Sequence, residues 1–440
     1  MKKPVVIAPT PASVHSLTNE GIGIAAVNGK TTFIEGALPQ ETVKYRLFKK
    51  RRHYDEAAVS EILSHSPERS TPKCSHFGYC GGCSMQHLDA QAQIGWKEKI
   101  LLGQLIHLGQ VKPDHILPPL VAAPWGYRHK ARLGARYLPR EKKVVVGFRK
   151  RFHHSVADLS HCEVLHPSIG ARLPQLSELL TSLEMKEQIP QMEVAIGDSI
   201  SALIFRHLQA LPESDVQKLR DFGLAHQIHI YLQPNPPAPI TLLWPDNHPE
   251  RLSYRLPESE IEMLFHPSDF TQIHLEINRL MVKQALALLD PQAEEKVLDL
   301  FCGIGNFTLP LARRAKTVVG IEGSQIMVER GYENAKHNQI SNCEFHAANL
   351  FEPKGKAPWM QTQYDKILLD PPRTGAKEII EYFPQLAPQR IVYVSCNPAT
   401  LARDANKLVH NLGYRLKQVG VMNMFPHTSH LEAMAVFERG

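Results

Sequence analysis

The sequence predicts an α/β fold, built on a doubly wound parallel sheet in its C-terminal part with smaller β-rich modules before it. Residues 296–309 read KVLDLFCGIGNFTL, the pattern of a buried strand, a glycine turn and the start of a helix. Four more apolar runs read as strands, at 317–321, 343–347, 365–369 and 391–395. Helical stretches fall between them, at 324–338, 376–383 and 399–411. This alternation is typical of a sheet that binds its ligand at the carboxyl ends of its strands.

Length and charge narrow the class of protein. A chain of 440 residues is expected to form two or three domains, which we place at 1–66, 67–268 and 269–440. Its net charge of +6 suits an acidic partner. No apolar run has the length of a membrane span, and Val5–Ala8 is too short for a signal-peptide core. We therefore expect a cytoplasmic protein that does not enter a membrane.

Residues 1–66 are expected to fold as a small β-barrel. Gly and Pro signals separate four β-like runs, at 21–27, 32–35, 41–48 and 57–63. One hairpin gathers six basic side chains, namely Lys44, Arg46, Lys49, Lys50, Arg51 and Arg52. With the aromatic residues Phe48 and Tyr54 beside them, these cations suit a groove for single-stranded nucleic acid. The alternative is a solvated edge strand that its lysines keep soluble.

Three of the seven cysteines are packed into ten residues, as Cys74-x5-Cys80-x2-Cys83 with three glycines interspersed. Glycines let such a loop curl, so that three thiolates can turn toward one metal centre. A closed site needs a fourth ligand, and Cys162 is the nearest candidate along the chain. Four thiolates suit either zinc or an iron–sulfur cluster. The spacing argues against unrelated buried cysteines.

The stretch 122–154 is the most basic part of the chain. Between residues 124 and 151 it has one acid, Glu141, and ten basic residues: Arg128, Lys130, Arg132, Arg136, Arg140, Lys142, Lys143, Arg149, Lys150 and Arg151. Runs at 133–138 and 144–148 read as a hairpin, and aromatic residues interleave with the basic ones. Such a surface is typical of nucleic-acid binding, and the alternative is a charged, solvated hairpin.

The rest of the central part is expected to be an antiparallel sheet. Five alternating runs read as its strands, at 192–197, 200–206, 226–232, 240–244 and 261–265. Residues 91–108, nearer the N-terminus, have the periodicity of a surface helix. None of these runs carries chemistry by itself.

Five segments between 299 and 434 carry a family resemblance: DLFCGIGNFTLPLA, GIEGS, LLDPPRTG, VSCNPATLARD and FPHTSHLEAM. In this order they resemble the S-adenosylmethionine-dependent RNA uracil-C5 methyltransferases, over residues 269–440. The resemblance implies a class I, Rossmann-like methyltransferase domain with S-adenosylmethionine as its cofactor. It also implies that the helix at 91–108 packs on this domain.

The resemblance assigns six residues to the methyl donor: Gln272, Phe301, Asn306, Glu322, Asn349 and Asp370. Gln272 lies in Phe-Thr-Gln-Ile-His, where His274 stands in place of an Asn of the family pattern, so no role is carried over to His274. Glu322 also has a physical reason, because a carboxylate at the end of the second strand can accept both hydroxyls of a ribose. Asp370 is placed to contact either the donor or the uracil.

The chemistry of uracil explains why the family pattern contains a cysteine. C5 of uracil is a weak nucleophile, and a thiolate that adds to C6 makes C5 reactive. Cys396 follows the fifth strand and matches this nucleophile, and we expect its site to favour the thiolate. Glu432 matches the base that later removes the C5 proton. Without the resemblance, the two would read as a buried structural thiol and an ordinary carboxylate.

Two further resemblances concern RNA and metal. Residues 1–66 resemble the TRAM domain, an OB-like RNA-binding barrel, through GIGIAAVNGKTTFIEGALPQE and KKRRHYDEA. The segment PKCSHFGYCGGCSMQHLD resembles the cluster segment of the ribosomal uracil methyltransferases. This implies a [4Fe–4S] cluster held by Cys74, Cys80, Cys83 and Cys162.

Taken together, the three parts imply methylation of 23S rRNA, of the uracil-1939 type, at an unpaired or flipped uridine. No obligate protein partner is evident. One alternative is methylation of a tRNA uracil, although the tRNA enzymes of the family lack the cluster motif. The other is an RNA-binding assembly factor with an idle site, against which the intact Cys396 and Glu432 argue.

Overall fold

The structure, a computed structural model, describes residues 11–235, 238–246, 248–353 and 355–440. The segment Val5–Ala8, weighed above as a signal-peptide core, lies outside these residues. Among the helices of the described residues, none combines the length and the hydropathy needed to cross a membrane.

The chain divides into two compact units. One consists of Met1–Ile100 with Phe425–His430, and the other of Leu101–Met424 with Leu431–Gly440. The domain boundaries expected at 66 and 268 stay predictions.

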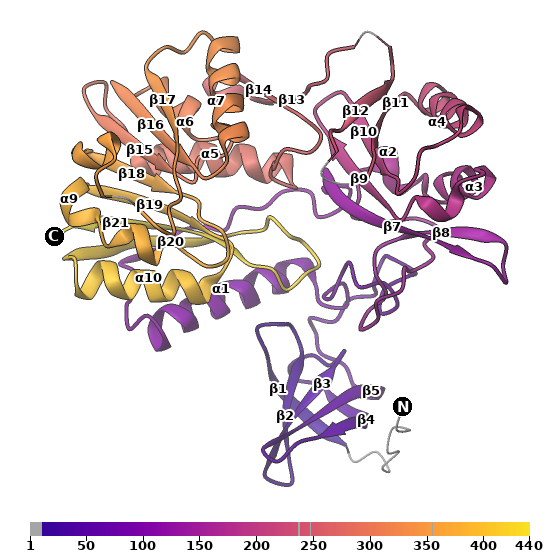
Figure 1. Cartoon of the computed structure of the whole chain (residues 1–440). Coiled ribbons are helices and arrows are strands. Elements are labelled where there is room, and N and C mark those ends of the chain that lie inside the picture. The colour runs from indigo at the N-terminus through magenta and orange to yellow at the C-terminus, as the bar shows by residue number, and fades with distance from the viewer. Residues whose placement is uncertain (1–10, 236–237, 247, 354) are drawn as a thin grey trace. The chain divides into compact units, whose positions relative to one another are not determined.

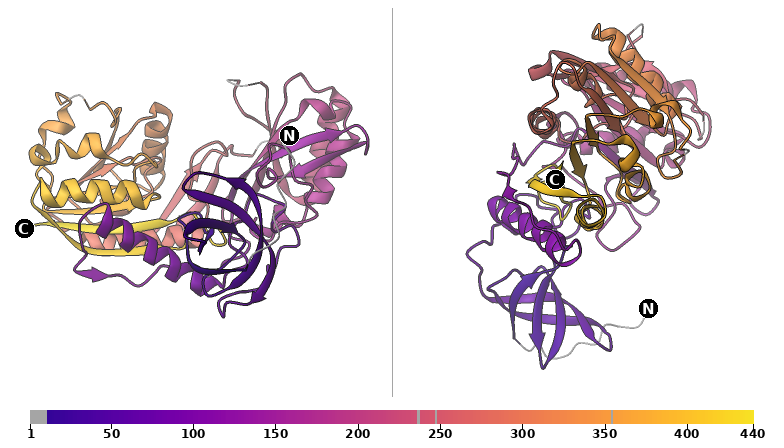
Figure 2. Two further views of the ribbon diagram at one scale, coloured as in Figure 1. Left: turned by 90° about the horizontal axis from the view of Figure 1, so that it is seen from below. Right: turned by 90° about the vertical axis from the view of Figure 1, so that its left-hand side faces the viewer.

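The first unit begins with a closed five-stranded barrel, seen as a ring in Figure 2, left. Its strands are β1 (Ala12–Leu17), β2 (Gly23–Val27), β3 (Lys30–Glu35), β4 (Thr42–Lys50) and β5 (Tyr54–Ser64). They pair in the order β1-β2-β3-β5-β4, and β1 closes the ring on β4. Four of these strands were expected. Strand β1 was not expected, because half of ASVHSL is Ser or His and the apolar signal is weak.

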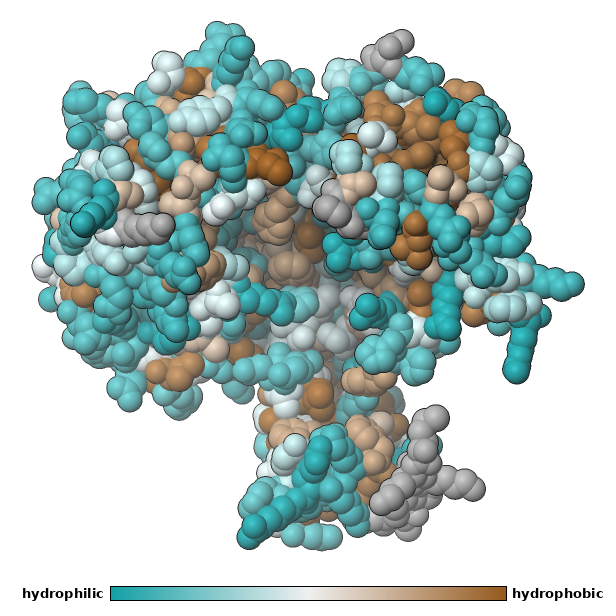
Figure 3. Space-filling model, in the orientation of Figure 1, coloured by the Kyte–Doolittle hydropathy of each residue, from teal (hydrophilic) through white to brown (hydrophobic). Residues whose placement is uncertain are grey.

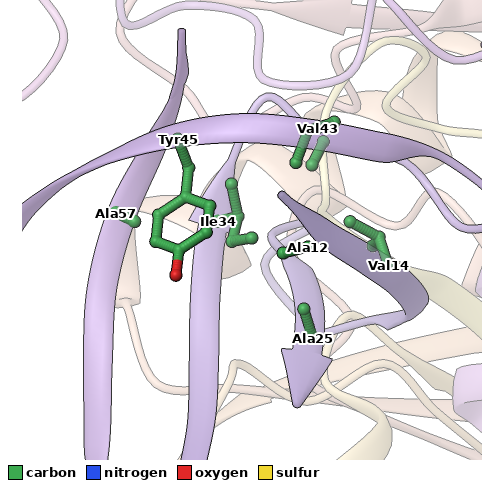
Figure 4. Packing of buried hydrophobic residues seen from close by; sticks show 8 residues of the cluster. Ala12, Val14, Ala25, Ile34, Val43, Tyr45 and Ala57 are labelled. Carbon is green, nitrogen blue, oxygen red and sulfur yellow. The ribbon is translucent and has the colours of Figure 1, made fainter. Parts of the chain in front are cut away.

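Small and β-branched side chains fill the barrel, as Figure 4 shows for Ala12, Val14, Ala25, Ile34, Val43, Tyr45 and Ala57. Burial alternates along the strands, as it must when successive side chains point to opposite faces of a sheet. The predominance of small residues fits the narrow interior of a barrel with few strands.

Helix α1 (Ala90–His107) confirms the helix expected at 91–108, and its first turns complete this unit. The Gln93 side chain accepts a hydrogen bond from the His427 amide at 2.9 Å. Lys97 donates to the carbonyl of Phe425 at 2.9 Å. The helix thereby holds a segment that lies more than 300 residues further along the chain.

The second unit contains a six-stranded sheet in the order β12-β11-β10-β9-β7-β8. Its strands are β7 (Lys130–Leu138), β8 (Lys143–Gly147), β9 (Gln191–Ile196), β10 (Ser201–Arg206), β11 (Ile228–Gln233) and β12 (Thr241–Trp244). Its helical elements are α2 (Pro167–Gly170), α3 (Leu173–Ser182), η1 (Lys186–Gln188) and α4 (Glu213–His226). Figure 1 shows α3 and α4 beside this sheet, where they pack on β8 and β11. Hydrophobic surface gathers near β10 and β11 on the face seen in Figure 3.

The expectation of an antiparallel central sheet is wrong in two respects. Strands β10 and β11 run parallel, with Ser201 opposite Ile228, because α4 crosses between them. The run at 261–265 also leaves this sheet, since β13 (Leu252–Leu256) and β14 (Ile261–Phe265) form a separate hairpin around η2 (Pro257–Ser259).

An eight-stranded sheet in the order β17-β16-β15-β18-β19-β21-β20-β6 makes up the rest of the unit. Its strands are β6 (His115–Ile116), β15 (Lys296–Leu300), β16 (Thr317–Glu322), β17 (Cys343–Ala347), β18 (Lys366–Leu369), β19 (Arg390–Ser395), β20 (Tyr414–Met422) and β21 (Glu432–Arg439). The first five strands in the sheet order are parallel, which confirms the doubly wound sheet. Strand β21 lies antiparallel between β19 and β20, and β6 pairs with β20 at the edge.

Helices cover this sheet, as Figure 1 shows. They are α5 (Leu275–Leu289), α6 (Thr308–Ala312), α7 (Gln325–His337), η3 (Pro358–Gln361), α8 (Lys377–Ile380), α9 (Phe383–Leu386) and α10 (Pro398–His410). The central strands are largely apolar because both of their faces are buried. The order reverses at β15, whose neighbours are β16 and β18, so a crevice is expected at the carboxyl ends of these strands.

Candidate active site

The predicted site residues follow the strands on both sides of this reversal. Phe301 comes directly after β15, Glu322 ends β16, Asp370 follows β18 and Cys396 follows β19. Because the carboxyl ends of parallel strands meet at one edge of a sheet, the fold brings these four residues to the same edge.

The turn after β15 has an unusual backbone. Phe301 adopts a φ of +64°, which is uncommon for a bulky residue and is found where the surroundings impose it. Gly303 has a φ of +55°, and a Cβ added there would have no heavy atom within 4 Å. The turn therefore leaves open space beside its backbone, as a bound ligand requires.

Glu322 is hydrogen-bonded through both of its carboxylate oxygens. One oxygen accepts from the Gly303 amide at 3.2 Å and the other from the Ser324 amide at 3.0 Å. These bonds fix the carboxylate beside the turn, and its remaining lone pairs can accept hydroxyl groups.

Gln272 and Asp370 lie 98 residues apart in the chain and are brought together. The Gln272 amide donates to the Asp370 carboxylate at 3.3 Å. Burial raises the pKa of the Asp370 carboxyl to about 7. This group therefore changes its protonation near neutral pH, as acid–base groups of active sites often do.

Asp299, in the middle of β15, is a site residue that the sequence reasoning missed. Its side chain is fully buried, and one oxygen accepts from the Thr308 hydroxyl at 2.6 Å. The other oxygen has no hydrogen-bond partner among the described residues. Burial, helped by the charges of Asp370 and Glu322, raises the pKa of Asp299 to about 8. A carboxylate inside an otherwise apolar strand was the signal that could have revealed it.

Two of the predicted donor-binding residues have other partners. The Asn306 side chain exchanges hydrogen bonds with Asn278 at 2.9 and 3.1 Å and accepts one from the Tyr254 hydroxyl at 2.8 Å. Asn349 is exposed, and its side-chain oxygen accepts from the Phe351 amide at 3.0 Å. The donor-binding roles of Asn306 and Asn349 stay predictions.

Cys396 and Glu432 face each other through the register of two strands. Ser395 in β19 is paired with Ala433 in β21, and the strands are antiparallel. The next residues in this register are Cys396 on one strand and Glu432 on the other. Glu432 is 4% exposed. The fold thus brings together the predicted nucleophile and the predicted base.

The environment of Cys396 favours the thiol and not the thiolate. Burial, followed by the negative charges of Glu432 and Asp370, raises the pKa of the Cys396 thiol to about 11, against an opposing effect of Arg373. The expectation that the site favours the thiolate is therefore wrong for the protein alone, because two carboxylates surround the sulfur.

Hydrogen bonds fix the loop after β19 to the loop after β18. The Asn397 side chain caps α10 by accepting from the Ala399 amide at 3.1 Å, and it donates to the carbonyl of Arg373 at 2.9 Å. The Thr400 hydroxyl donates to the same carbonyl at 3.2 Å. Cys396 is thereby held on a loop that cannot move independently of Asp370.

His274 turns out to be structural. It is 1% exposed, and its imidazole bonds to the carbonyl of Ala123 at 3.1 Å and stacks on Tyr127 at 4.9 Å. Burial lowers the pKa of His274 to about 4, so the ring is neutral. It lines a pocket of about 330 Å³ beside the start of α5, together with Trp125, His166 and other residues.

The basic stretch divides into structural and exposed residues. Lys130 is largely buried and donates to the carbonyl of Asp269 at 2.6 Å, and burial lowers its pKa to about 8. Lys143 pairs with Asp158 at 2.6 Å. The side chains of Arg136, Arg140, Lys142 and Arg149 are exposed.

The predicted metal ligands lie in both units. Cys74, Cys80 and Cys83 belong to the first unit and Cys162 to the second, and all four are partly exposed. Within the described parts of the chain, no group of three or more His, Cys, Asp or Glu side chains is arranged to hold a metal ion. The cluster stays a prediction.

Comparison with known proteins identifies relatives over nearly the whole chain. A 23S rRNA (uracil(1939)-C(5))-methyltransferase RlmD of Hahella chejuensis is 52% identical over 431 residues, which cover 97% of this chain and 96% of the relative. A protein of the same description from Alcanivorax borkumensis is 49% identical, covering 100% of this chain and 98% of its own.

A solved structure has the same fold. The Pyrococcus abyssi tRNA (uracil-54, C5)-methyltransferase, in complex with S-adenosyl-L-homocysteine, matches with a TM-score of 0.74 and 23% identity. The match covers 97% of this chain and 100% of that one. The expected Rossmann-like methyltransferase fold is thereby confirmed.

Two family matches complete the comparison. Residues 10–59 match the TRAM domain, which confirms the expected identity of the barrel. Residues 188–440 match the family described as tRNA (Uracil-5-)-methyltransferase. The chain therefore belongs to the tRNA (uracil-5-)-methyltransferase family, and it carries a TRAM domain at its N-terminal side.

Proposed function

We propose that the protein methylates C5 of a uracil in 23S rRNA, of the uracil-1939 type, with S-adenosylmethionine as the methyl donor. The names of the two relatives at 52% and 49% identity support the reaction and the substrate. The observation that supports the proposal is that Cys396 and Glu432 adjoin the last residue pair of β19 and β21, with the charges of Glu432 and Asp370 close enough to act on the thiol. A thiol facing a buried carboxylate suits covalent catalysis followed by proton removal.

We assign the donor to the crevice at the reversal of the sheet. The residues proposed to hold it are Gln272, Phe301, Asn306, Glu322, Asn349 and Asp370. The open space beside Gly303 and the fixed carboxylate of Glu322 support this assignment. When bound, the donor supplies the methyl group.

The chain's own residues carry out the remaining steps. The Cys396 thiol gives up its proton, for which the adjacent carboxylate of Asp370 is the acceptor, so that Glu432 stays ionised for the later step. The sulfur bonds to C6 of the uracil, and the electrons of the C5–C6 double bond move toward the C4 carbonyl, so that C5 becomes a nucleophile. Once C5 is methylated, Glu432 removes its proton, the double bond re-forms and the thiolate leaves.

The decisive test of the function compares two unmodified RNAs. The purified protein is given labelled S-adenosylmethionine with a fragment of 23S rRNA or with tRNA, and labelled 5-methyluridine is measured. We expect product on the rRNA fragment. Transfer to tRNA alone would favour the alternative that the name of the Pyrococcus abyssi enzyme suggests. No transfer to either RNA would favour an idle binding factor.

We also propose that a [4Fe–4S] cluster binds to the protein, with Cys74, Cys80, Cys83 and Cys162 as ligands. Three features of the loop support this. Its cysteines are partly exposed, Gly78 turns the chain with a φ of +84°, and the Gly82 amide donates to the sulfur of Cys80 at 3.3 Å. Such amide-to-sulfur bonds are usual around thiolate-bound clusters. Zinc is the alternative that metal analysis separates.

The proposed partner is 23S rRNA, and the TRAM domain supports RNA binding. We propose the cytoplasm as the location because ribosomal RNA is the proposed substrate.

A further inference from the structure

The loop at residues 149–156, which follows β8, presents a side chain that the fold does not use. Phe152 is 79% exposed, the largest fraction among the large hydrophobic residues that the structure describes as exposed. Single apolar side chains are common on protein surfaces, so exposure alone would say little. At Phe152 it is combined with an unusual backbone and with strongly basic neighbours.

The backbone holds Phe152 in a conformation that a bulky residue rarely adopts. Its φ is +56°, in the left-handed region. Hydrogen bonds close the loop on either side: the Lys150 amide donates to the carbonyl of Ser155 at 2.8 Å, and the His153 amide to the carbonyl of Lys150 at 3.2 Å. The His153 ring also bonds to the Ser155 hydroxyl at 2.8 Å. A closed turn, and not a loose loop, therefore presents the aromatic ring.

The neighbours of Phe152 suit a polyanion. Three basic residues precede it, and two histidines follow: Arg149, Lys150, Arg151, His153 and His154. The Arg151 guanidinium lies 5.2 Å from the centre of the Phe152 ring.

We propose that Phe152 stacks on an unpaired base of the substrate RNA while the basic residues of the loop contact the phosphates. This inference rests on the proposed function. Combined aromatic and basic side chains are the usual means of holding single-stranded nucleic acid. An enzyme that takes a uridine out of its stack leaves neighbouring bases without a partner, and a rigidly held ring can replace that partner.

Two variants separate the ring from the loop that carries it. Phe152→Asn removes the ring but tolerates a positive φ, whereas Phe152→Tyr keeps the ring. Binding of a 23S rRNA fragment is measured over a series of salt concentrations. We expect Phe152→Asn to bind about 5- to 100-fold more weakly with an unchanged salt slope, and Phe152→Tyr to stay within about twofold of the parent. Arg149→Ala should instead flatten the salt slope.

Three results would overturn the proposal. They are parent-like binding by Phe152→Asn, an equal loss in Phe152→Tyr, and a loss that comes with a flatter salt slope. Any of these would mean that the ring does not stack. A parent protein that binds no RNA at all would refute the proposed function together with this inference, so the two failures are distinguishable.

Fluorescence gives a second, direct readout. In Phe152→Trp the new indole should be quenched when the rRNA fragment binds, because a stacked base is close to it. The matched control is Leu208→Trp, at another exposed position of the second unit, where the residue is 51% exposed. RNA should leave this signal unchanged. Equal quenching at both positions, or none at 152, would contradict stacking.

Discussion

Cysteines mark two regions of the protein, the carboxyl edge of the eight-stranded sheet and the loop at 74–83, and the fold holds them by different means. At the sheet edge, the pairing of β19 with β21 ends at Ser395 and Ala433, and Cys396 and Glu432 are the residues that adjoin this last pair. In the loop, a few turns hold the cysteines, such as the bond from the Phe77 amide to the carbonyl of Cys74 at 3.0 Å. Strand register does not depend on a ligand, whereas the folding of a metal-binding loop does.

Because of this difference, we expect substitutions in the two regions to affect different properties of the protein. Changes at the sheet edge should alter the chemistry and spare the fold. Changes in the loop should alter the fold of the loop and spare donor binding. Each substitution below tests whether the sheet edge and the cysteine loop respond in these different ways.

The largest effect is expected at the nucleophile. Cys396→Ala removes the attacking sulfur, so methyl transfer should fall by about 10⁴-fold or more while the melting temperature changes little. Glu432→Gln keeps the size of the side chain but cannot take a proton, so a covalent RNA adduct should accumulate and survive a denaturing gel. The double variant should behave like Cys396→Ala, because the two steps occur in sequence.

An adduct that forms without the Cys396 sulfur would contradict the covalent mechanism. So would Glu432→Gln releasing methylated RNA at the parent rate. A large loss of stability in Cys396→Ala would contradict the expected difference between the two regions, because strand pairing should hold the sheet edge without the thiol.

The second effect concerns the metal. Protein purified without oxygen should be brown and contain about four irons per chain, as a [4Fe–4S] cluster requires. Cys80→Ser should lose most of this iron and melt at a lower temperature, yet bind S-adenosylmethionine normally. Cys343→Ala, at a buried cysteine of β17, is the control and should keep its iron. Colourless protein with one zinc per chain would rule out the cluster.

The third effect is a dependence of stability on pH. The pKa of Asp299 is raised to about 8 in the folded protein, so the folded state binds more protons than the unfolded state at neutral pH. The free energy of unfolding should therefore decrease from about pH 4 to pH 8, by about 1 kcal/mol per pH unit. Asp299→Asn cannot ionise and should flatten this decline in urea unfolding at pH 5 to 8. Equal slopes for both proteins would show that Asp299 is already charged when folded.

The smallest effect is expected in the basic stretch. Replacing Arg149, Lys150 and Arg151 with Ala should weaken RNA binding about tenfold and reduce the salt slope by about 2, as the loss of up to three phosphate contacts implies. Lys143→Ala is the matched control, because Lys143 already pairs with Asp158. Donor binding should not change in either variant. A salt slope of RNA binding equal to that of the parent would mean that these basic side chains contact solvent and not RNA phosphates.

The parallel sheet was largely predictable. Strands such as β15 and β19 are buried on both faces, so they appear as continuous apolar runs between glycine and proline signals. The pairing of strands was less accessible. The sequence predicted that β10 and β11 are strands, but not that they are parallel, because the polar helix α4 between them carries a weak signal.

At the site, the motifs offered candidate residues, whose roles stay predictions, whereas the electrostatics could not be read from the sequence. The family motifs pointed to Cys396, Glu432 and Asp370. The raised pKa of Cys396 follows from burial and from two nearby carboxylates, and no single motif contains all three groups. Likewise, ten basic residues could be counted along the chain. The sequence did not show that Lys130 is partly buried and bonded to the carbonyls of Pro267 and Asp269, because these lie more than 130 residues further along the chain.

The insertion of β21 between β19 and β20 has a consequence for how the sheet and its site are assembled. β21 follows β20 in the chain but enters the sheet inside it, so the hairpin can dock only as a whole. The donor crevice at β15, β16 and β18 needs none of these last strands. A molecule with an undocked hairpin would keep the strands of the proposed donor crevice, but the proposed base Glu432, which begins β21, would be separated from Cys396, which follows β19.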